Sequence, residues 1–341
     1  VEVVDPYRWL ETGDDPEVQR WVSEQNRVTR TSLDERPSRT IWHERVAELM
    51  DLPVVQSVHV RGDRLFLLER QSGQPQARLL VRPLSDPGSG AVVLVDPSAD
   101  TDDGAAAVDW SFPSNDGELV AVGVSEGGTE NSVLRVVRSA DGSRVGEEIP
   151  NCRAASVAWE SDGSGFFYTR YPEGDEYHRT VHHHTLGRPW ADDPVVWAEH
   201  PTPQTWPEVG ISPDGRYLLV DAMVGWSRTD QHLLDRETGR WHTLVEGVEA
   251  TTQFVFADEW RLIGATTLEA PKGRIISIAL DRLPVDHTHW TTIVPEREVV
   301  VGAPRPVGDR FVVTVSHSGV DAIESLSLIH ISEPTRPNAP S

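Results

Sequence analysis

The chain has 341 residues, with 54 Asp and Glu against 31 Lys and Arg, and a formal net charge of −23 at pH 7. This acidic balance argues against nucleic acid and against anionic membranes as partners, because both are bound through basic patches. Apolar runs are strand-sized, far short of the ~20 residues that a membrane-spanning helix needs. Cys152 is the single cysteine, which excludes an intrachain disulfide framework and favours a reducing, cytoplasmic location.

Residues 1–53 predict a helical arm. Asp15 followed by Pro16 is a typical helix start, with an N-cap and a proline at the first helical position. Apolar residues then recur at helical spacing: Val18, Trp21, Val22 and Val28. After Pro37 the pattern is repeated, with Ser38 as the expected cap and a stripe of Trp42, Val46, Leu49 and Met50. Two amphipathic helices are therefore expected, each needing a surface to pack against.

From residue 54 to residue 325 the pattern changes to short apolar runs separated by Gly, Pro, Asp and Ser, which is typical of an all-β array. A turn followed by an apolar strand recurs six times, marked by Asp63, Asp116, Asp162, Asp214, Asp258 and Asp309. Successive markers are 53, 46, 52, 44 and 51 residues apart, which is room for four short strands. The segment "LLDRETGRWHTL" predicts the hairpin that closes such a unit. The period predicts a β-propeller of about five to six blades, with the sixth cut short.

Several segments resemble the prolyl oligopeptidase family of serine peptidases. The most specific is "DPYRWLE" at residues 5–11, ahead of the helical "VQRWVSEQN"; "VAWESDGSGFFYTRYP", "VHHHTLG" and "ISPDGRYLLV" are similar to successive blades in the family's order. The resemblance extends from about Val3 to Ser325. It implies a seven-bladed type of propeller, here incomplete at its C-terminal end, and an arm that packs on an α/β-hydrolase domain.

In that family the propeller covers the hydrolase domain and admits short peptides but not folded proteins. The catalytic Ser, Asp and His follow the propeller in sequence. The resemblance therefore implies a gating and substrate-selecting region that is inactive alone, whose partners are short peptides and its own hydrolase domain. We expect no catalytic residue, metal site or cofactor in this chain. Cleavage after proline and cleavage after basic residues both stay open, and a stand-alone propeller that acts as a protein-interaction scaffold is the alternative.

Two short motifs are candidates for chemistry within the chain. "GVSEG" at residues 123–127 fits the G-x-S-x-G pattern around Ser125, but a nucleophile elbow needs a helix after the turn. A second strand-like run follows instead, so a hairpin inside a blade is expected. Among the consecutive residues His182–His184, only His182 and His184 can share a strand face, and no third metal ligand lies near in sequence. Partly buried strand histidines are the favoured interpretation.

Met223 and Trp226 are the candidate substrate-facing residues. They lie at and after the strand of the "SPDG" blade, at a loop that the family directs toward its central chamber. Some relatives place a substrate-binding arginine at or near the position of Met223, and an aromatic residue of the proline pocket falls on Ala154. Neither contact transfers to this chain, which leaves strict post-proline specificity open.

The C-terminal segment is expected to be foreign to the fold. "LSLIHISEPTR" at residues 326–336 is similar to a translated sequencing-library adaptor and to no blade segment. We therefore expect the natural sequence to end near Ser325, with residues 326–341 a non-native tail. His330 and Glu333 then carry no functional role, and an open propeller edge would make the isolated chain poorly soluble.

Overall fold

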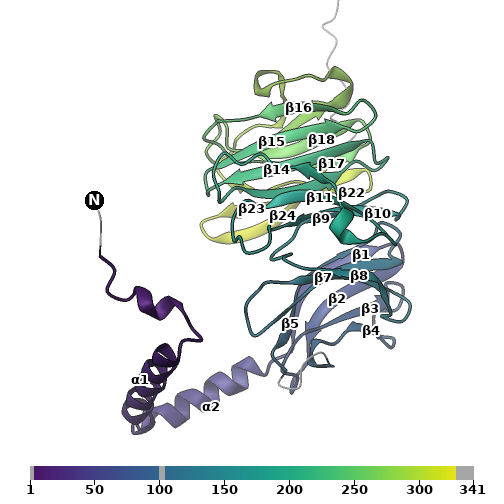
Figure 1. Cartoon of the computed structure of the whole chain (residues 1–341). Helices are drawn as coiled ribbons and strands as arrows, with labels where there is room; N and C mark the ends of the chain where they lie inside the picture. The colour runs from purple at the N-terminus through teal and green to yellow at the C-terminus, as the bar shows by residue number, and fades with distance from the viewer. Residues whose placement is uncertain (1–3, 100–103, 328–341) are drawn as a thin grey trace, which may run out of the picture. The chain divides into compact units, whose positions relative to one another are not determined.

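The computed structural model describes residues 4–99 and 104–327, which divide into two compact units. The first, the helical unit, runs to Val54 and includes Arg70–Gln74. It contains the 3₁₀ helix η1 (Arg8–Glu11) and the helices α1 (Pro16–Asp34) and α2 (Ser38–Met50) (Figure 1). The predicted cap of α1 is confirmed: the Asp15 carboxylate accepts a 2.7 Å hydrogen bond from the Glu17 amide.

The start of α2 differs from the prediction. Pro37, not Ser38, occupies the N-cap position, and no side chain caps the helix. The reason is that Pro37 already has helical φ and ψ angles, and the Arg39 amide donates to the Arg36 carbonyl. At the other end, Ser72 and the Gly73 amide donate to the Asp51 carboxylate over 2.5 and 2.7 Å. These bonds join the segment Arg70–Gln74 to the end of α2.

Most apolar side chains of the two helices are exposed. Val18 is buried, at 4% exposure, and Trp9 packs edge-on against Trp21 with ring centroids 6.2 Å apart. The other predicted stripe residues are exposed: Trp21, Val22, Val28, Trp42, Val46, Leu49 and Met50. Two helices are thus present as predicted. α1 is amphipathic, whereas the apolar residues of α2 are not concentrated on one face.

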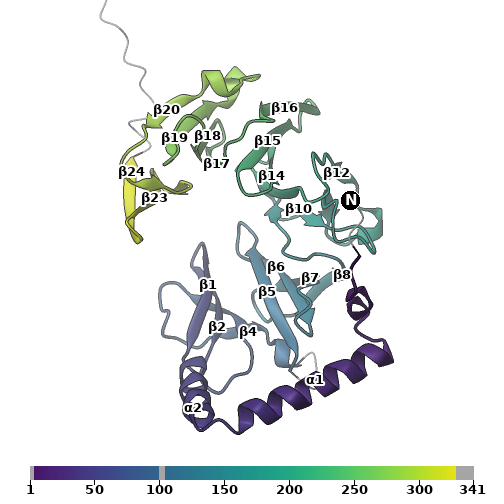
Figure 2. The same cartoon turned by 90° about the vertical axis from the view of Figure 1, so that its left-hand side faces the viewer.

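The second unit, the sheet unit, is a β-propeller-like array of six antiparallel sheets. Figure 2 shows the sheets following one another in chain order around a common axis. Sheet 1 has β1 (Val54–Arg61), β2 (Arg64–Arg70), β3 (Arg78–Pro83) and β4 (Val92–Val95); sheet 2 has β5 (Ala106–Pro113), β6 (Leu119–Glu126), β7 (Val133–Arg138) and β8 (Arg144–Ile149). Sheet 3 has β9 (Val157–Trp159), β10 (Gly165–Arg170), β11 (Thr180–Thr185) and β12 (Val195–Trp197).

Sheet 4 has β13 (Trp206–Ile211), β14 (Tyr217–Val224), β15 (Arg228–Asp235) and β16 (Arg240–Val245); sheet 5 has β17 (Thr252–Asp258), β18 (Arg261–Thr266), β19 (Arg274–Ala279) and β20 (Thr291–Val294). Sheet 6 has β21 (Val300–Val301), β22 (Arg305–Val307), β23 (Arg310–His317) and β24 (Val320–Ser327). Short 3₁₀ helices η2 to η5 lie between strands: Pro97–Ala99, Trp190–Asp192, Leu280–Arg282 and His287–His289. The predicted hairpin of "LLDRETGRWHTL" is confirmed as β15 and β16.

The six marker aspartates lie in or directly beside the turns that precede β2, β6, β10, β14, β18 and β23, which confirms the predicted repeat. In "SNDG" of sheet 2, the Ser114 hydroxyl donates to Asp116 over 2.6 Å, and Gly117 has φ +71°. "SPDG" of sheet 4 repeats the arrangement with a 2.5 Å bond from Ser212 to Asp214. These two turns thus share one geometry, in which the glycine supplies the positive φ.

Buried apolar clusters lie between successive sheets, because alternate residues of each strand point to opposite faces. In sheet 3, Phe166 packs toward sheet 2 while Phe167 packs toward sheet 4. In sheet 4, Leu218 packs toward sheet 3 while Leu219 packs toward sheet 5. Five such clusters join the six sheets in chain order within the described residues.

The structure corrects the seven-bladed expectation, because it contains six sheets and no seventh among the described residues. Sheet 6 is also narrower than the others: β21 and β22 pair with different parts of the same edge of β23, and β24 pairs with the opposite edge. It therefore occupies three strand positions instead of four.

The strand β24 continues through Ser327, with Leu326 paired to Phe311. Two residues of the expected tail therefore belong to a strand, and the rest, residues 328–341, lie outside the described residues. Among the described residues, neither helix combines the length and the hydropathy that a bilayer crossing requires.

Candidate functional site

A cavity of about 620 Å³ lies among the inner strands and turns of the sheet unit. Its wall comes from five of the six sheets, at Asn115, Ser161, Glu208–Ser212, Gln253–Phe256 and Ala303–Arg305, with Pro213, Leu219 and Asp221. This volume lies within the range of roughly 300–1,000 Å³ that is usual for ligand sites. We call it the central cavity.

Two carboxylates stand side by side on the sheet 4 wall of the central cavity. Glu208 of β13 and Asp221 of β14 are directly paired in the antiparallel register, and like charges in that relation repel. Burial, together with the charge of Glu208, raises the pKa of Asp221 well above its usual range, although a hydrogen bond from Gln231 opposes the shift. The surroundings of Asp221 therefore favour its neutral, protonated form.

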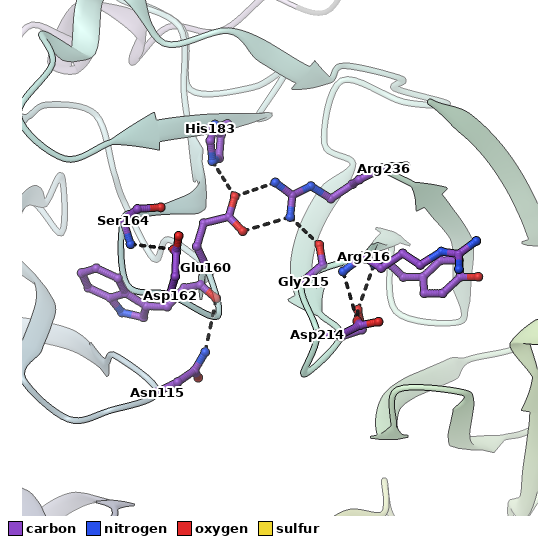
Figure 3. Close-up of polar contacts among 12 residues, drawn as sticks. Asn115, Glu160, Asp162, Ser164, His183, Asp214, Gly215, Arg216 and Arg236 are labelled. Carbon is purple, nitrogen blue, oxygen red and sulfur yellow. Dashed lines mark hydrogen bonds and ion pairs between the residues drawn. The ribbon is translucent and has the colours of Figure 1, made fainter. Parts of the chain in front are cut away.

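A network of polar contacts between sheets 3 and 4 holds the turns that line this cavity (Figure 3). The Glu160 carboxylate accepts two hydrogen bonds from the Arg236 guanidinium, at 2.6 and 2.9 Å, and lies 2.8 Å from His183 Nε2. Arg236 also donates to the Gly215 carbonyl in the "SPDG" turn. The contacts thereby fix the turn at Ser161 to the turn of sheet 4.

Burial by itself raises the pKa of Glu160, but hydrogen bonds from His183 and Arg236, with the positive charge of Arg236, outweigh it and hold the pKa below 4.5. The carboxylate is therefore ionised at neutral pH. Its side chain is 11% exposed and that of Arg236 is 29% exposed. The pair is a partly buried ion pair, in which bidentate geometry favours a fixed arrangement.

The predicted chamber residues lie near the opposite end of sheet 4 from its "SPDG" turn. Met223, near the end of β14, pairs with Trp206 and Thr229, and Trp226 lies in the turn before β15 with 96% of its surface exposed. Neither residue belongs to the wall of the central cavity. An indole so exposed on a tight turn is a large apolar surface available for contact.

The G-x-S-x-G segment forms a hairpin, as predicted. Ser125 lies inside β6, is 4% exposed, and donates to Asp109 over 3.1 Å. Gly127 and Gly128 both have positive φ and form the turn that leads into β7. The strand–turn–helix context of a nucleophile elbow is thus missing at Ser125.

The three histidines of β11 contact different partners. His183 bonds Glu160, His184 lies 2.9 Å from the buried Asp193, and His182 Nε2 lies 2.8 Å from the Thr180 hydroxyl. The part of the chain that the structure describes contains no group of three or more His, Cys, Asp or Glu side chains suited to a metal ion. These imidazoles therefore act in packing and hydrogen bonding.

Glu160, Arg236 and the Glu208–Asp221 pair were not predicted from the sequence. For Glu160 a signal was present: "ESDG" has glutamate where "SNDG" and "SPDG" have serine. The longer side chain reaches the next sheet instead of capping its own turn. For Asp221 no comparable signal exists. The aspartate in "YLLVDA" can be recognised as one of a pair of carboxylates only when its cross-strand neighbour is known.

Comparison with known proteins agrees with this architecture. Residues 1–333 match the family model described as the N-terminal β-propeller domain of prolyl oligopeptidase. The chain belongs to the prolyl oligopeptidase family. It corresponds to the N-terminal propeller region of these peptidases, and the sheets of its described residues are all antiparallel, with no hydrolase sheet among them.

Curated relatives of this family include prolyl oligopeptidase A of Galerina marginata, 30% identical over 69% of the chain and 36% of the relative. Prolyl oligopeptidase A of Amanita bisporigera is 24% identical over 83% of the chain and 42% of the relative. The chain thus spans well under half the length of these relatives.

Among solved structures, a prolyl endopeptidase superposes with a TM-score of 0.87 at 28% identity, over 98% of the chain and 50% of that structure. Prolyl oligopeptidase B of Galerina marginata, bound to a 35-residue hydrolysis and macrocyclization substrate, gives 0.83 at 21% identity, over 96% of the chain and 49% of that structure. The second likeness shows a common fold.

Proposed function

We propose that this chain is the gating and substrate-selecting region of a serine peptidase that hydrolyses short peptides. The observation that carries the proposal is the match of residues 1–333 to the propeller domain of prolyl oligopeptidases, with a central cavity of ligand size inside that propeller. Bond cleavage would belong to an α/β-hydrolase domain of the same protein, and this chain alone would not hydrolyse peptides. A cytoplasmic location is part of the proposal and is supported by the single, buried Cys152.

A seventh sheet would complete the ring between sheet 6 and sheet 1. Large apolar side chains are exposed on the strands that border this position, including Val58 and Val60 of β1 and Ile323 of β24, with 55%, 44% and 78% exposure. Elsewhere in the unit, such side chains are buried in the apolar clusters between neighbouring sheets. A further blade would remove these surfaces from water.

Met223 and Trp226 would face the substrate chamber. Trp226 supports this part of the proposal through its 96% exposed indole, which offers apolar surface to a peptide side chain. The chain carries no feature that decides between cleavage after proline and cleavage after a basic residue.

The sequence of the intact gene tests the proposal. A G-x-S-x-G segment beyond Ser325, followed by Asp and His in that order, is expected. A stop codon soon after a seventh blade would instead support a stand-alone propeller scaffold. Kinetics of the full-length product with chromogenic Gly-Pro and Arg peptides would then decide the specificity.

A further inference from the structure

A second cavity, of about 330 Å³, lies between loops of sheets 2 and 3. The loops are residues 127–132, 150–156 and 171–179, and the side chains used below are Asn131, Asn151, Arg153 and Tyr171. We call it the loop cavity. Because consecutive strands run in opposite directions, these loops lie at the opposite end of the sheets from the turns marked by the aspartates, which is also the end where Trp226 is found.

The three loops are tied together by backbone hydrogen bonds. The Tyr171 amide donates to the Asn151 carbonyl over 2.9 Å, and the Cys152 amide donates to the Ser132 carbonyl over the same distance. The cavity is therefore a formed feature of the fold and does not depend on one loop folding over another.

The backbone around the loop cavity is strained. Among the described residues, six non-glycine residues have a positive φ, and four of them lie in these loops: Glu130, Asn151, Ala154 and His178, at 57°, 60°, 44° and 53°. Such conformations cost of order 1–3 kcal/mol each and gather at sites where geometry matters for function. The strain here is spread over all three loops.

A buried guanidinium supports the strained segment from behind. Arg179 is 0% exposed, donates to the carbonyls of Arg153 and Ala154, and stacks on the rings of Trp206 and Tyr171 at 4.0 and 5.3 Å. Burial lowers its pKa to about 10, and its Nε and Nη1 atoms are buried without a hydrogen-bond partner in the described chain. Burying a guanidinium with unpaired N–H groups costs desolvation free energy. That the fold retains Arg179 here indicates that holding these two carbonyls in place is important.

The wall of the loop cavity carries charged groups, among them Glu176, and neutral hydrogen-bonding groups. Arg153 is held by Glu130 at 3.2 Å and Asp175 by His178 at 2.8 Å, so these charges already have partners. Within the described residues, the side-chain amides of Asn131 and Asn151 make no hydrogen bond. A carboxamide offers one acceptor and two donors, which match the N–H and C=O of a peptide group.

We propose that the loop cavity is a subsite for an extended peptide segment, in which the amides of Asn131 and Asn151 pair with peptide groups of the substrate beside the ring of Tyr171. This inference rests on the proposed function of peptide selection and adds a location and a chemistry to it. The subsite recognises the backbone of the peptide, so it accepts peptides with many different side chains.

The test uses NMR titration of the chain with a capped Ala-Gly pentapeptide and with its ester analogue, in which one central amide is replaced by an ester. We expect the amide peptide to bind about three- to tenfold more tightly than the best-placed ester, since one net hydrogen bond is lost. Asn151→Gly removes the carboxamide at a position where glycine adopts the positive φ without strain. It should weaken amide-peptide binding by a similar factor and abolish the preference for amide over ester.

Ser318→Gly is the matched control, because it relieves a positive φ of 51° at the β23–β24 turn, far from the loop cavity in sequence and sheet order. It should leave the dissociation constant unchanged. Asn131→Ala, in an exposed loop, provides a second variant if Asn151→Gly folds poorly. Unchanged peptide binding by both asparagine variants would overturn the subsite while leaving peptide selection standing. Failure of the unaltered chain to bind any peptide would overturn both.

Discussion

The contact between Glu160 and Arg236 offers the sharpest test of how sheets 3 and 4 are held together. Glu160→Gln keeps the size of the side chain but removes its charge, and both partners of the ion pair are less than one-third exposed. Breaking a fully buried pair costs about 3–5 kcal/mol, so for this partly buried pair we expect a loss of about 2 kcal/mol in the free energy of unfolding. Urea denaturation at pH 7 measures it.

A double-mutant cycle with Arg236→Met separates the pair from the other contacts of Arg236, its hydrogen bond to the Gly215 carbonyl and its stacking on the Phe167 ring. We expect a coupling energy of about 1–3 kcal/mol. Glu48→Gln is the control, because the Arg45–Glu48 ion pair is equally short, at 2.6 Å, but 56% and 67% exposed. It should cost less than about 0.5 kcal/mol. A coupling energy no larger than the control would refute the argument that this network fixes the two turns.

The same network predicts how the stability of the folded chain changes with pH. Because the folded pKa of Glu160 is held below 4.5, the stability that its ionised form contributes is fully present above about pH 4.5. It is lost as the pH falls through the folded pKa. The difference between the unaltered chain and Glu160→Gln should therefore shrink in acid. A difference that stays constant from pH 7 to pH 3 would contradict the assignment of an ionised Glu160.

Three further outcomes are expected. Asp221→Asn should raise the free energy of unfolding at pH 7, because it removes a carboxylate that burial, and secondarily the charge of Glu208, disfavours in its ionised form; ending the repulsion alone contributes about 0.2–1 kcal/mol. Because the folded pKa of Asp221 is raised above 3.8, this gain should vanish below that pH. Equal gains in urea melts at pH 3 and pH 7 would contradict the prediction. Gly123→Ala should cost about 1–3 kcal/mol in a urea melt, since a Cβ would lie 2.1 Å from the Trp110 ring; a neutral result would show that the ring moves freely. Ile323→Lys should reduce light scattering with a stability change within about 0.5 kcal/mol, and unchanged scattering would count against an aggregating edge at β24.

The sequence predicted those parts of the fold that depend on local chemistry. Asp15 caps α1 because its carboxylate reaches an amide two residues on. The "SNDG" and "SPDG" turns repeat because serine, aspartate and glycine determine the geometry of the turn locally. The misplaced cap at Ser38 shows the limit of such reasoning. A serine near a helix start is a cap only if the preceding backbone is not already helical, and Pro37 is helical.

The candidate sites were harder to predict, because they depend on contacts between sheets. Arg236 meets Glu160 across 76 positions of sequence, and Arg179 reaches carbonyls more than 20 residues away. No periodic pattern or motif in a single sequence indicates that these residues meet, so neither contact could be predicted. The six turn-and-strand repeats, in contrast, were visible in the sequence and correspond to the six sheets of the described residues, whereas the seven-bladed type was implied only by the family resemblance.

The central claim is that this chain selects peptides but does not cleave them. Its most direct test is the release of p-nitroaniline from a capped Gly-Pro substrate and from an Arg substrate, measured for the purified chain and for the full-length product of its gene. We predict release by the full-length protein from at least one substrate, and none above the buffer background by the chain. Robust hydrolysis by the purified chain would contradict the account.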